Sequence, residues 1–435
     1  MRVLVVSSNR QRAQDTPLLA FPSGPAYIAG AAIEAGHEVE VFDACFSDDA
    51  PGELAGRVAA FDPDVVAVSI RNLSTYIRNA YQDLRPLFKE VTDCLKRTTS
   101  SPIVLGGPGF WNYGEELLDY LDLDFGIRGE GERVFPLYLE TLERGGDVTG
   151  TPGCVFRRDG KTHAVPVEPI SDLDSTAFPA FELFDVEAYR QLGTFPAIFT
   201  KRGCAFHCTH CPRSALEGSA YRLKSPGRVL AEIERARRAS AGDMFYFVDN
   251  LFNYPTSHAE AVCRELVESR AGIMWTADSI TPLGMTEKFC RLMKESGCAF
   301  LCLAAEHGSE SMLKRMERGY TPPQIKEAAA SLDGAGITYL VTLLLGGPGE
   351  TPETISEAIG LVDSLPGAPS VLATVGIGLE YNQAVAVEAL KEGLLADERE
   401  IFEGRFYFSP ALGEEYLLEL ADTLKARPNW QVRGI

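Results

Sequence analysis

The sequence predicts an α/β protein in which a flavodoxin-like or Rossmann-like parallel sheet is followed by a partial (β/α)6 barrel. Three observations support this prediction. The 435 residues exceed the usual size of a single hydrophobic core. Short apolar strands alternate with helical segments twice, over residues 1–145 and 196–390, which is typical of parallel sheets. Glycines and polar residues follow many of these strands, at the edge where parallel sheets bind ligands.

Residues 1–145 are expected to form a sheet that helices cover on both faces. The expected strands are apolar and β-branched, and they occupy residues 1–8, 37–43, 63–70, 101–107 and 122–132. Helical segments are expected at 25–36 and 133–142. Residues 146–195 are expected to hold a hairpin that turns at Asp159-Gly160, followed by a linker.

Residues 196–390 are expected to form the barrel. Its six strands are predicted at 197–201, 244–248, 273–278, 299–304, 338–345 and 371–378. Helical segments lie between them, at 226–239, 257–270, 286–297, 309–319, 322–336 and 351–365. Six β-α units indicate an open barrel, with its chemistry at the carboxyl ends of the strands. Residues 391–435 are expected to be a C-terminal extension without a domain of its own.

The composition excludes some classes of protein. The formal net charge is −20, and the sequence has no basic cluster of the kind that binds nucleic acid. This charge has two interpretations, general solubility or an acidic cleft that attracts a cationic substrate. No apolar run reaches the roughly 18–20 residues that span a bilayer, and the first residues lack the pattern of a signal peptide. We therefore expect a cytoplasmic protein that binds neither nucleic acid nor membrane.

Three of the ten cysteines stand close together, in the segment KRGCAFHCTHCPRS. Cys204, Cys208 and Cys211 have the spacing C-x3-C-x2-C, and no fourth cysteine lies nearby. Iron–sulfur clusters are usually held by four thiolates, so three would leave one iron of a [4Fe–4S] cluster open to a small molecule. A zinc knuckle that uses His207 or His210 as the fourth ligand is the alternative.

This spacing after the first strand of a β/α barrel resembles the signature of radical S-adenosylmethionine (SAM) enzymes. In that family the open iron binds SAM, and one-electron reduction releases a 5′-deoxyadenosyl radical. FYFVDNLFNYP, LAAEHGSESMLKRMERGYT and LLLGGPGETPET resemble further segments of the family. The resemblance implies that Glu306, Gly346 and Gly347 hold SAM and that His210 lies near its adenine, with His307 in place of the usual serine. The alternatives are a helix cap at Glu306 and a simple turn at the glycines.

A flavodoxin-like sheet before such a barrel resembles the cobalamin-binding radical SAM enzymes. The D-x-H-x-x-G cobalamin loop is absent, and Ser74 stands where a related segment usually has an acid. Arg71 and Asn72 follow the third strand and are the expected cobalamin contacts. Pro108 and Trp111 are expected to fill the pocket beside the fourth strand. Two alternatives follow, a cobalamin site or a scaffold domain that shapes the substrate cleft and docks a partner.

The choice of reaction depends on the residues at the barrel mouth. Carboxylates and a tyrosine there could take and give protons, and the candidates are Glu217, Asp249, Asp278, Glu380 and Tyr381. About half of them are expected to cap helices instead.

The acidic segment GIGLEYNQA and the net charge point to a cationic amino sugar. The pattern resembles the radical SAM dehydratases of aminoglycoside antibiotic biosynthesis. These imply a flavodoxin-type or ferredoxin-type electron donor and a separate NADPH-dependent reductase. The alternatives are a cobalamin-dependent C-methyltransferase of natural-product biosynthesis and a non-catalytic iron–sulfur or zinc module.

Overall fold

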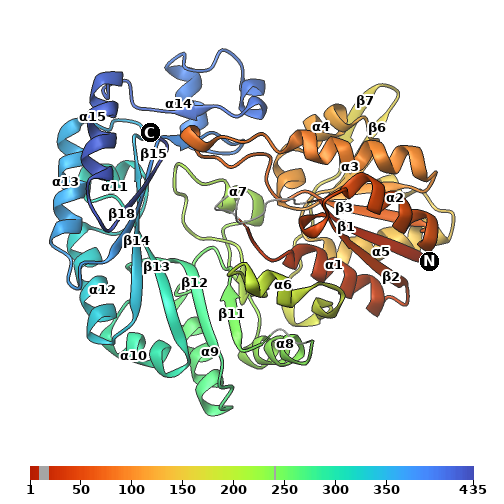
Figure 1. The fold of residues 1–435 in the computed structure, drawn as a ribbon, viewed down its shortest axis with the longest axis horizontal. Coiled ribbons are helices and arrows are strands. Elements are labelled where there is room, and N and C mark those ends of the chain that lie inside the picture. The colour runs from red at the N-terminus through yellow and green to blue at the C-terminus, as the bar shows by residue number, and fades with distance from the viewer. Residues whose placement is uncertain (9–18, 240–241) are drawn as a thin grey trace. The chain divides into compact units, whose positions relative to one another are not determined.

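The computed structural model describes residues 1–8, 19–239 and 242–435. The chain forms two compact units (Figure 1). The first comprises residues 1–75, 82–196 and 234–242, and the second comprises 76–81, 197–233 and 243–435.

The first unit contains a sheet of seven strands in the order β2-β1-β3-β4-β5-β6-β7. The strands are β1 (Arg2–Ser7), β2 (Glu38–Asp43), β3 (Val65–Ser69), β4 (Ile103–Gly106), β5 (Phe125–Ile127), β6 (Cys154–Arg158) and β7 (Lys161–Ala164). The first five are parallel, and their apolar side chains, such as Val3, Val5 and Val65, are buried. The predicted parallel sheet is therefore confirmed.

Helices cover both faces of this sheet. They are α1 (Ser23–Glu34), α2 (Ala50–Phe61), α3 (Arg85–Thr98), α4 (Pro108–Leu121), α5 (Gly131–Glu143) and the short α6 (Val186–Gln191). In Figure 1, α2, α3 and α4 lie on one side of the strands, whereas α1 and α5 lie together on the other. The carboxyl ends of β1 to β5 remain at one edge, and this leaves that edge as the place for a ligand.

Residues 146–195 are more than a linker. The predicted hairpin turns at Asp159-Gly160, and both residues have a positive φ. Its strand β6 pairs antiparallel with β5, so the hairpin extends the sheet. Further along the chain, the Phe21 ring packs edge-to-face on Phe181 and Tyr189, and the Tyr189 hydroxyl donates to Asp43 Oδ2 at 2.6 Å. The segment therefore belongs to the core of the first unit.

The second unit contains a parallel sheet of seven strands in the order β18-β15-β14-β13-β12-β11-β8. The strands are β8 (Ala197–Ile198), β11 (Met244–Phe247), β12 (Met274–Ile280), β13 (Cys298–Glu306), β14 (Thr338–Leu345), β15 (Ser370–Val375) and β18 (Trp430–Arg433). Six of them correspond to the predicted barrel strands. The seventh, β18, lies in the C-terminal extension and pairs with β15, which extends the open barrel by one strand.

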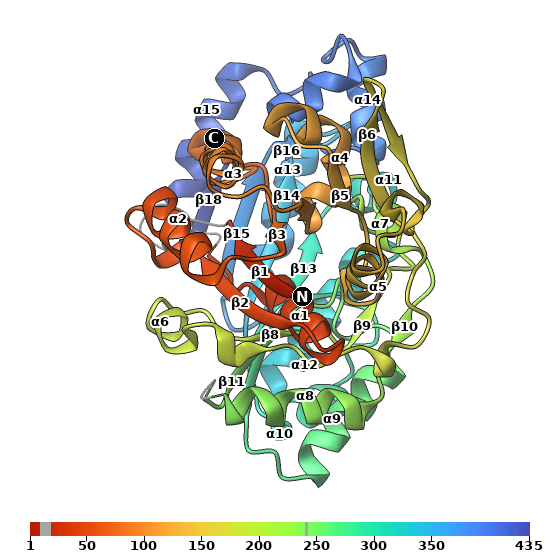
Figure 2. The same cartoon turned by 90° about the vertical axis from the view of Figure 1, so that its right-hand side faces the viewer.

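Helices follow these strands along the chain. They are α7 (Arg213–Glu217), α8 (Pro226–Arg238), α9 (Thr256–Glu268), α10 (Glu287–Glu295), α11 (Glu310–Arg315), α12 (Pro322–Gly334), α13 (Pro352–Asp363), α14 (Ala384–Lys391) and α15 (Glu414–Lys425). In Figure 1, α10, α12 and α13 lie along the outside of the sheet, and in Figure 2 α9 and α10 lie side by side. Alternate residues of β14, such as Leu340, Thr342 and Leu344, are less buried than their neighbours and line the other face of the sheet.

Two further pairs of short strands connect the loops of the second unit. β9 (Lys201–Arg202) pairs antiparallel with β10 (Arg222–Leu223), and β16 (Ile377–Gly378) pairs antiparallel with β17 (Phe406–Tyr407). Among the helices of the described ranges, none is long and apolar enough to cross a membrane.

Candidate cluster and cofactor site

The three motif cysteines lie in one loop, residues 203–221, which the β9–β10 pair closes at its base. The Cys204 amide donates to the Gly218 carbonyl at 3.0 Å. Gly203 has a φ of +87°, and a Cβ there would stand 2.2 Å from the Ala220 carbonyl oxygen. This position therefore requires glycine. The backbone thus holds Cys204 next to the β9–β10 pair at the start of the loop.

All three thiols are shielded from solvent. Cys204 and Cys208 are 8% and 7% exposed, and Cys211 is half-buried. Burial raises the pKa of Cys204 and Cys208, and it raises the pKa of Cys211 to about 11. Three thiol donors on a single loop fit a [4Fe–4S] cluster with one iron open.

Arg318 contacts the cluster loop from the segment that follows α11. Its Nη1 lies 2.8 Å from the Cys208 sulfur, and its Nε donates to the Tyr320 hydroxyl at 2.9 Å. The Tyr320 hydroxyl in turn donates to the Ala304 carbonyl at 2.5 Å. Arg318 Nη2 is also 3.5 Å from Glu306 Oε1, so one guanidinium connects the loop to the end of β13. Neither Arg318 nor Tyr320 was a sequence candidate, although both lie in a segment that resembles the family.

Glu217 and Asp249 hold backbone segments together. The Glu217 carboxylate accepts from Asn250 Nδ2 at 2.8 Å and from the Gly203 amide at 3.3 Å. The buried Asp249 carboxylate accepts from the backbone and hydroxyl of Thr200 and from the backbone and Nζ of Lys201, at 2.6–3.1 Å. Both carboxylates therefore fix residues 200–203, where the cluster loop begins.

Glu380 and Tyr381 follow β16 and are half-buried. Their neighbour Gln383, which the sequence did not single out, accepts from the Glu380 amide at 2.9 Å and donates to the His210 carbonyl at 2.9 Å. This places Glu380 and Tyr381 beside the backbone of the cluster loop. The Nδ1 atom of His210 is buried without a hydrogen-bond partner, and burial lowers the pKa of His210 to about 4, so the ring is neutral. A neutral His210 ring with an unpaired Nδ1 fits the predicted position beside the adenine of SAM.

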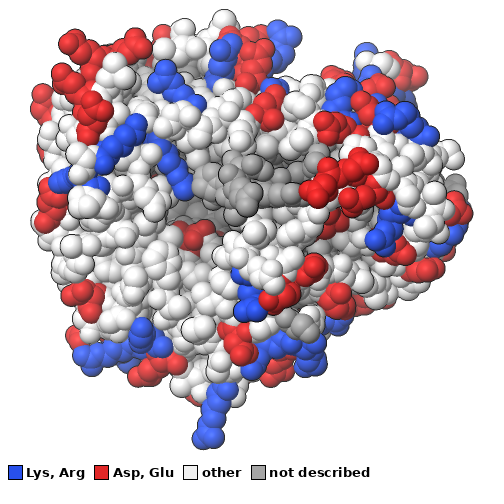
Figure 3. Space-filling model, viewed as in Figure 1, with Lys and Arg blue, Asp and Glu red and all other residues white. Residues whose placement is uncertain are grey.

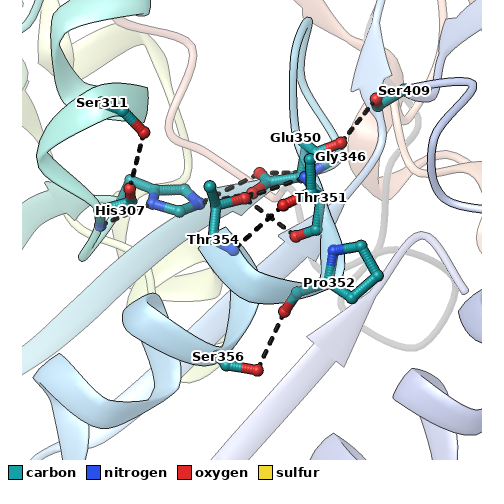
Figure 4. A network of polar contacts seen from close by, with 10 residues as sticks. His307, Ser311, Gly346, Glu350, Thr351, Pro352, Thr354, Ser356 and Ser409 are labelled. Carbon is teal, nitrogen blue, oxygen red and sulfur yellow. Dashed lines mark hydrogen bonds and ion pairs between the residues drawn. The ribbon is translucent and has the colours of Figure 1, made fainter.

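The expected SAM-binding glycines belong to a buried network that Figure 4 shows. Glu350 and His307 are completely buried, and His307 Nε2 lies 3.0 Å from both Glu350 oxygens. The Gly346 amide donates to Glu350 Oε2 at 3.2 Å, and the Ser409 amide donates to the Gly346 carbonyl at 2.8 Å. The network therefore joins the end of β13, where Glu306 lies, to Gly346-Gly347, which follow β14.

Asp278 lies on β12 and is exposed. The Cys302 thiol of the adjacent strand β13 donates to its Oδ1 at 3.6 Å. Of the carboxylate candidates, Asp278 is therefore the one that lies within a strand of the sheet.

Several carboxylates of the second unit, where an acidic cleft was predicted, have close polar partners. Glu217, Asp249, Glu306 and Glu350 each have a nearby cationic or hydrogen-bonding partner. On the face shown in Figure 3, lysines and arginines are interspersed among the acidic side chains. A group of acidic residues at the upper left lies over α15, whose exposed carboxylates are Glu414, Glu415, Glu419 and Asp422. Much of the negative charge is therefore ordinary solvated surface.

In the first unit, Arg71 and Asn72 follow β3 and are half-buried. Gly106 ends the adjacent strand β4 and Gly107 follows it, and a Cβ on Gly107 would stand 2.6 Å from the Ile70 carbonyl oxygen. The glycine thus allows the two loops to approach each other at the ligand-binding edge of the sheet. This backbone cradle with two adjacent polar side chains fits a large polar cofactor such as cobalamin.

The expectation that Pro108 and Trp111 fill this pocket stays a prediction, and both residues lie in the first turn of α4. Pro108 is the first residue of α4 and is exposed, and Trp111 is half-buried in the first helical turn. The ring that points inward is Phe110, which is completely buried and packs on Gly126 of β5. Ser74, the other departure from the family pattern, is buried.

Comparison with known proteins supports both halves of this arrangement. Residues 198–362 match the radical SAM superfamily, and residues 15–139 match the B12 binding domain. An uncharacterized methyltransferase, PH0819, from Pyrococcus horikoshii is 27% identical over 348 residues, which are 79% of this chain and 73% of that protein. The tryptophan 2-C-methyltransferase of Streptomyces laurentii is 24% identical over 400 residues, and the match covers 65% of its length.

A solved structure has the same fold over nearly the whole chain. It is the radical SAM methyltransferase TsrM from Kitasatospora setae, with cobalamin and a [4Fe–4S] cluster bound. The TM-score is 0.85 at 22% identity, and the match covers 99% of this chain and 92% of TsrM.

These comparisons overturn the dehydratase interpretation. The relatives are named as methyltransferases and as anaerobic magnesium-protoporphyrin IX monomethyl ester cyclases, and none of those compared is a dehydratase acting on an amino sugar. The interpretation had rested on the net charge and on the acidic segment GIGLEYNQA, neither of which identifies a substrate. A radical SAM domain and a B12 binding domain are thus both found in this chain, and its fold matches that of a cobalamin-dependent radical SAM enzyme.

Proposed function

We propose that this protein is a cobalamin-dependent radical SAM C-methyltransferase. The observation that carries the proposal is a B12-binding domain followed, in the same chain, by a barrel with the three-cysteine loop. The methyltransferase names of several relatives support it. When bound, the cluster supplies the electron that cleaves SAM, and cobalamin supplies the methyl group.

The residues of the second unit divide into two groups. Cys204, Cys208 and Cys211 hold the cluster. Glu306 and the backbone of Gly346-Gly347 hold SAM, while the His307–Glu350 pair keeps these two segments together.

Two carboxylates have different parts in the proposal. Asp249 is structural, because its oxygens already accept four hydrogen bonds inside the barrel wall. Asp278, within strand β12, is the candidate for proton transfer with the substrate, with Glu380 and Tyr381 beside the cluster loop. An external one-electron protein donor of the flavodoxin or ferredoxin type would reduce the cluster.

In the first unit, we assign cobalamin binding to the edge formed by Arg71, Asn72 and Gly106-Gly107. A titration of the purified protein with hydroxocobalamin, followed by absorbance, tests this assignment. We expect one equivalent to bind. The double variant R71A/N72A should bind at least tenfold more weakly, because it removes the polar side chains at this edge.

The matched control is R57A. Arg57 is an exposed arginine of the same unit that pairs with Glu40 at 3.0 Å on the surface of α2. R57A should bind hydroxocobalamin as the unsubstituted protein does. Absence of binding to the folded, unsubstituted protein would overturn the proposed function.

The reaction itself is tested by anaerobic incubation with SAM, a reductant and a panel of acceptors that includes tryptophan, the named substrate of one relative. We expect a product heavier by one CH2 group, formed only when cobalamin is present. A product lighter by one water, or ring closure without methyl transfer, would contradict the proposal.

A further inference from the structure

Arg318 is a buried cation whose nearest acceptor is sulfur. Its side chain is 7% exposed, and an arginine keeps its positive charge when buried. Such a charge is costly unless an anion compensates it. Among the described residues, the carboxylate that pairs with it is that of Glu306, 3.5 Å away, whereas the Cys208 sulfur is 2.8 Å from Nη1.

As a ligand of iron, Cys208 would be a thiolate. A thiol sulfur is a weak acceptor, whereas a thiolate is an anion and makes a charge-assisted bond. A buried guanidinium at 2.8 Å from the sulfur is therefore arranged for a thiolate, which is the form that ligates iron.

We propose that Arg318 is the charge partner of the cluster thiolate Cys208 and raises the reduction potential of the cluster. The inference rests on the radical SAM assignment, not on the methyltransferase reaction. A [4Fe–4S]2+ core with three thiolates carries a net charge of about −1, and one added electron makes it about −2. A fixed cation at a ligand sulfur stabilises the more negative state more strongly, because potentials of these clusters depend on charge and on hydrogen bonds to sulfur.

Tyr320 fixes the direction of the guanidinium. Its hydroxyl accepts from Arg318 Nε and donates to the Ala304 carbonyl, so the arginine is held from the end of β13. Glu306 shares the same guanidinium at a longer distance, and its negative charge acts in the opposite sense. Substitution of Arg318 and of Glu306 should therefore move the potential in opposite directions.

The test is a redox titration of the reconstituted protein with dithionite, followed by electron paramagnetic resonance, without SAM, cobalamin or substrate. One electron from dithionite converts [4Fe–4S]2+ to [4Fe–4S]+, and no bond breaks. R318Q should lower the reduction potential of the cluster. At a fixed applied potential, the ratio of reduced to oxidised cluster should then fall at least tenfold, which corresponds to a decrease of about 59 mV. R318K, which keeps the charge but loses the forked geometry, should give a smaller decrease, and E306Q should raise the potential.

Tyr320→Phe is an intermediate variant, because it keeps the charge of Arg318 but removes the hydroxyl that orients the guanidinium. Its ratio of reduced to oxidised cluster should stay within threefold of the ratio in the unsubstituted protein. Iron content per chain shows whether each variant holds the cluster. An R318Q protein with a full cluster and an unchanged potential would overturn the proposal. Loss of the cluster in both R318Q and R318K would also overturn it, because Arg318 would then be purely structural. Since cobalamin and substrate are left out, failure of the methyltransferase proposal would not affect this result.

Discussion

Replacing Glu350 with alanine should release the two segments that are expected to hold SAM. The Glu350 carboxylate accepts from His307 Nε2, the Gly346 amide and the Thr354 hydroxyl (Figure 4). In E350A the Thr354 hydroxyl can still donate to the Thr351 carbonyl, which lies 2.9 Å away. The His307 ring and the Gly346 amide, in contrast, lose an acceptor inside a dry part of the barrel.

The size of the effect follows from these two stranded donors. Each buried donor without an acceptor costs about 1–3 kcal/mol, so the pair costs roughly 4 kcal/mol. Each 1.4 kcal/mol is about a factor of ten in an equilibrium constant, so local opening should become roughly a thousandfold more frequent. E350Q keeps one acceptor oxygen and should show a smaller effect.

Hydrogen exchange with mass spectrometry measures this opening directly. Peptides that cover residues 343–356 should exchange faster in E350A, whereas peptides of the first unit should not change. The dissociation constant of SAM should increase in the same variant. Ser356→Ala is the control, because Ser356 is exposed on α13 and its hydroxyl donates to the Pro352 carbonyl within that helix. An E350A protein with unchanged exchange over 343–356 and unchanged SAM affinity would refute this reasoning.

Three further predictions concern the framework of the site. Gly203→Ala should prevent full iron loading, because the added Cβ meets the Ala220 carbonyl at 2.2 Å; iron analysis checks this, and a fully loaded variant would contradict it. Asp249→Ala should destabilise the barrel by about 3–5 kcal/mol, measured by denaturation, because it strands the buried Lys201 ammonium; an unchanged denaturation midpoint would refute this. Burial lowers the pKa of His258, whose Nε2 contacts the Lys224 carbonyl at 2.8 Å. Below about pH 6.5 the unfolded chain therefore binds a proton that the folded chain does not. The free energy of unfolding should therefore decrease as the pH is lowered. Melting temperatures of His258→Gln should fall less over this range, and equal falls in both proteins would contradict the assignment.

The fold could be predicted because it depends on local patterns. Continuous apolar strands between helices indicate a parallel sheet, and this held for both units. β18 was missed because WQVR is short and only Trp430 is buried, so it carries little of the signal of a central strand. The hairpin at 154–164 was recognised, but its pairing with β5 could not be, because pairing depends on contacts distant in sequence.

The site was only partly predictable for the same reason. The three-cysteine motif is local and was visible in eight residues. Arg318, Glu350 and Gln383 act on partners 110, 43 and 173 positions away, and no spacing rule points to them. The acidic cleft stays a prediction, because a count of carboxylates does not show which of them have cationic partners.

The account of function depends on transfer of a methyl group from SAM by way of cobalamin. The most direct measurement starts from reconstituted, reduced protein that holds cobalamin. SAM with a deuterated methyl group is added, and the corrinoid fraction is then analysed by mass spectrometry. The account predicts that the label reaches the corrinoid together with one equivalent of S-adenosylhomocysteine. Protein that holds both the cluster and cobalamin but transfers no label would contradict it.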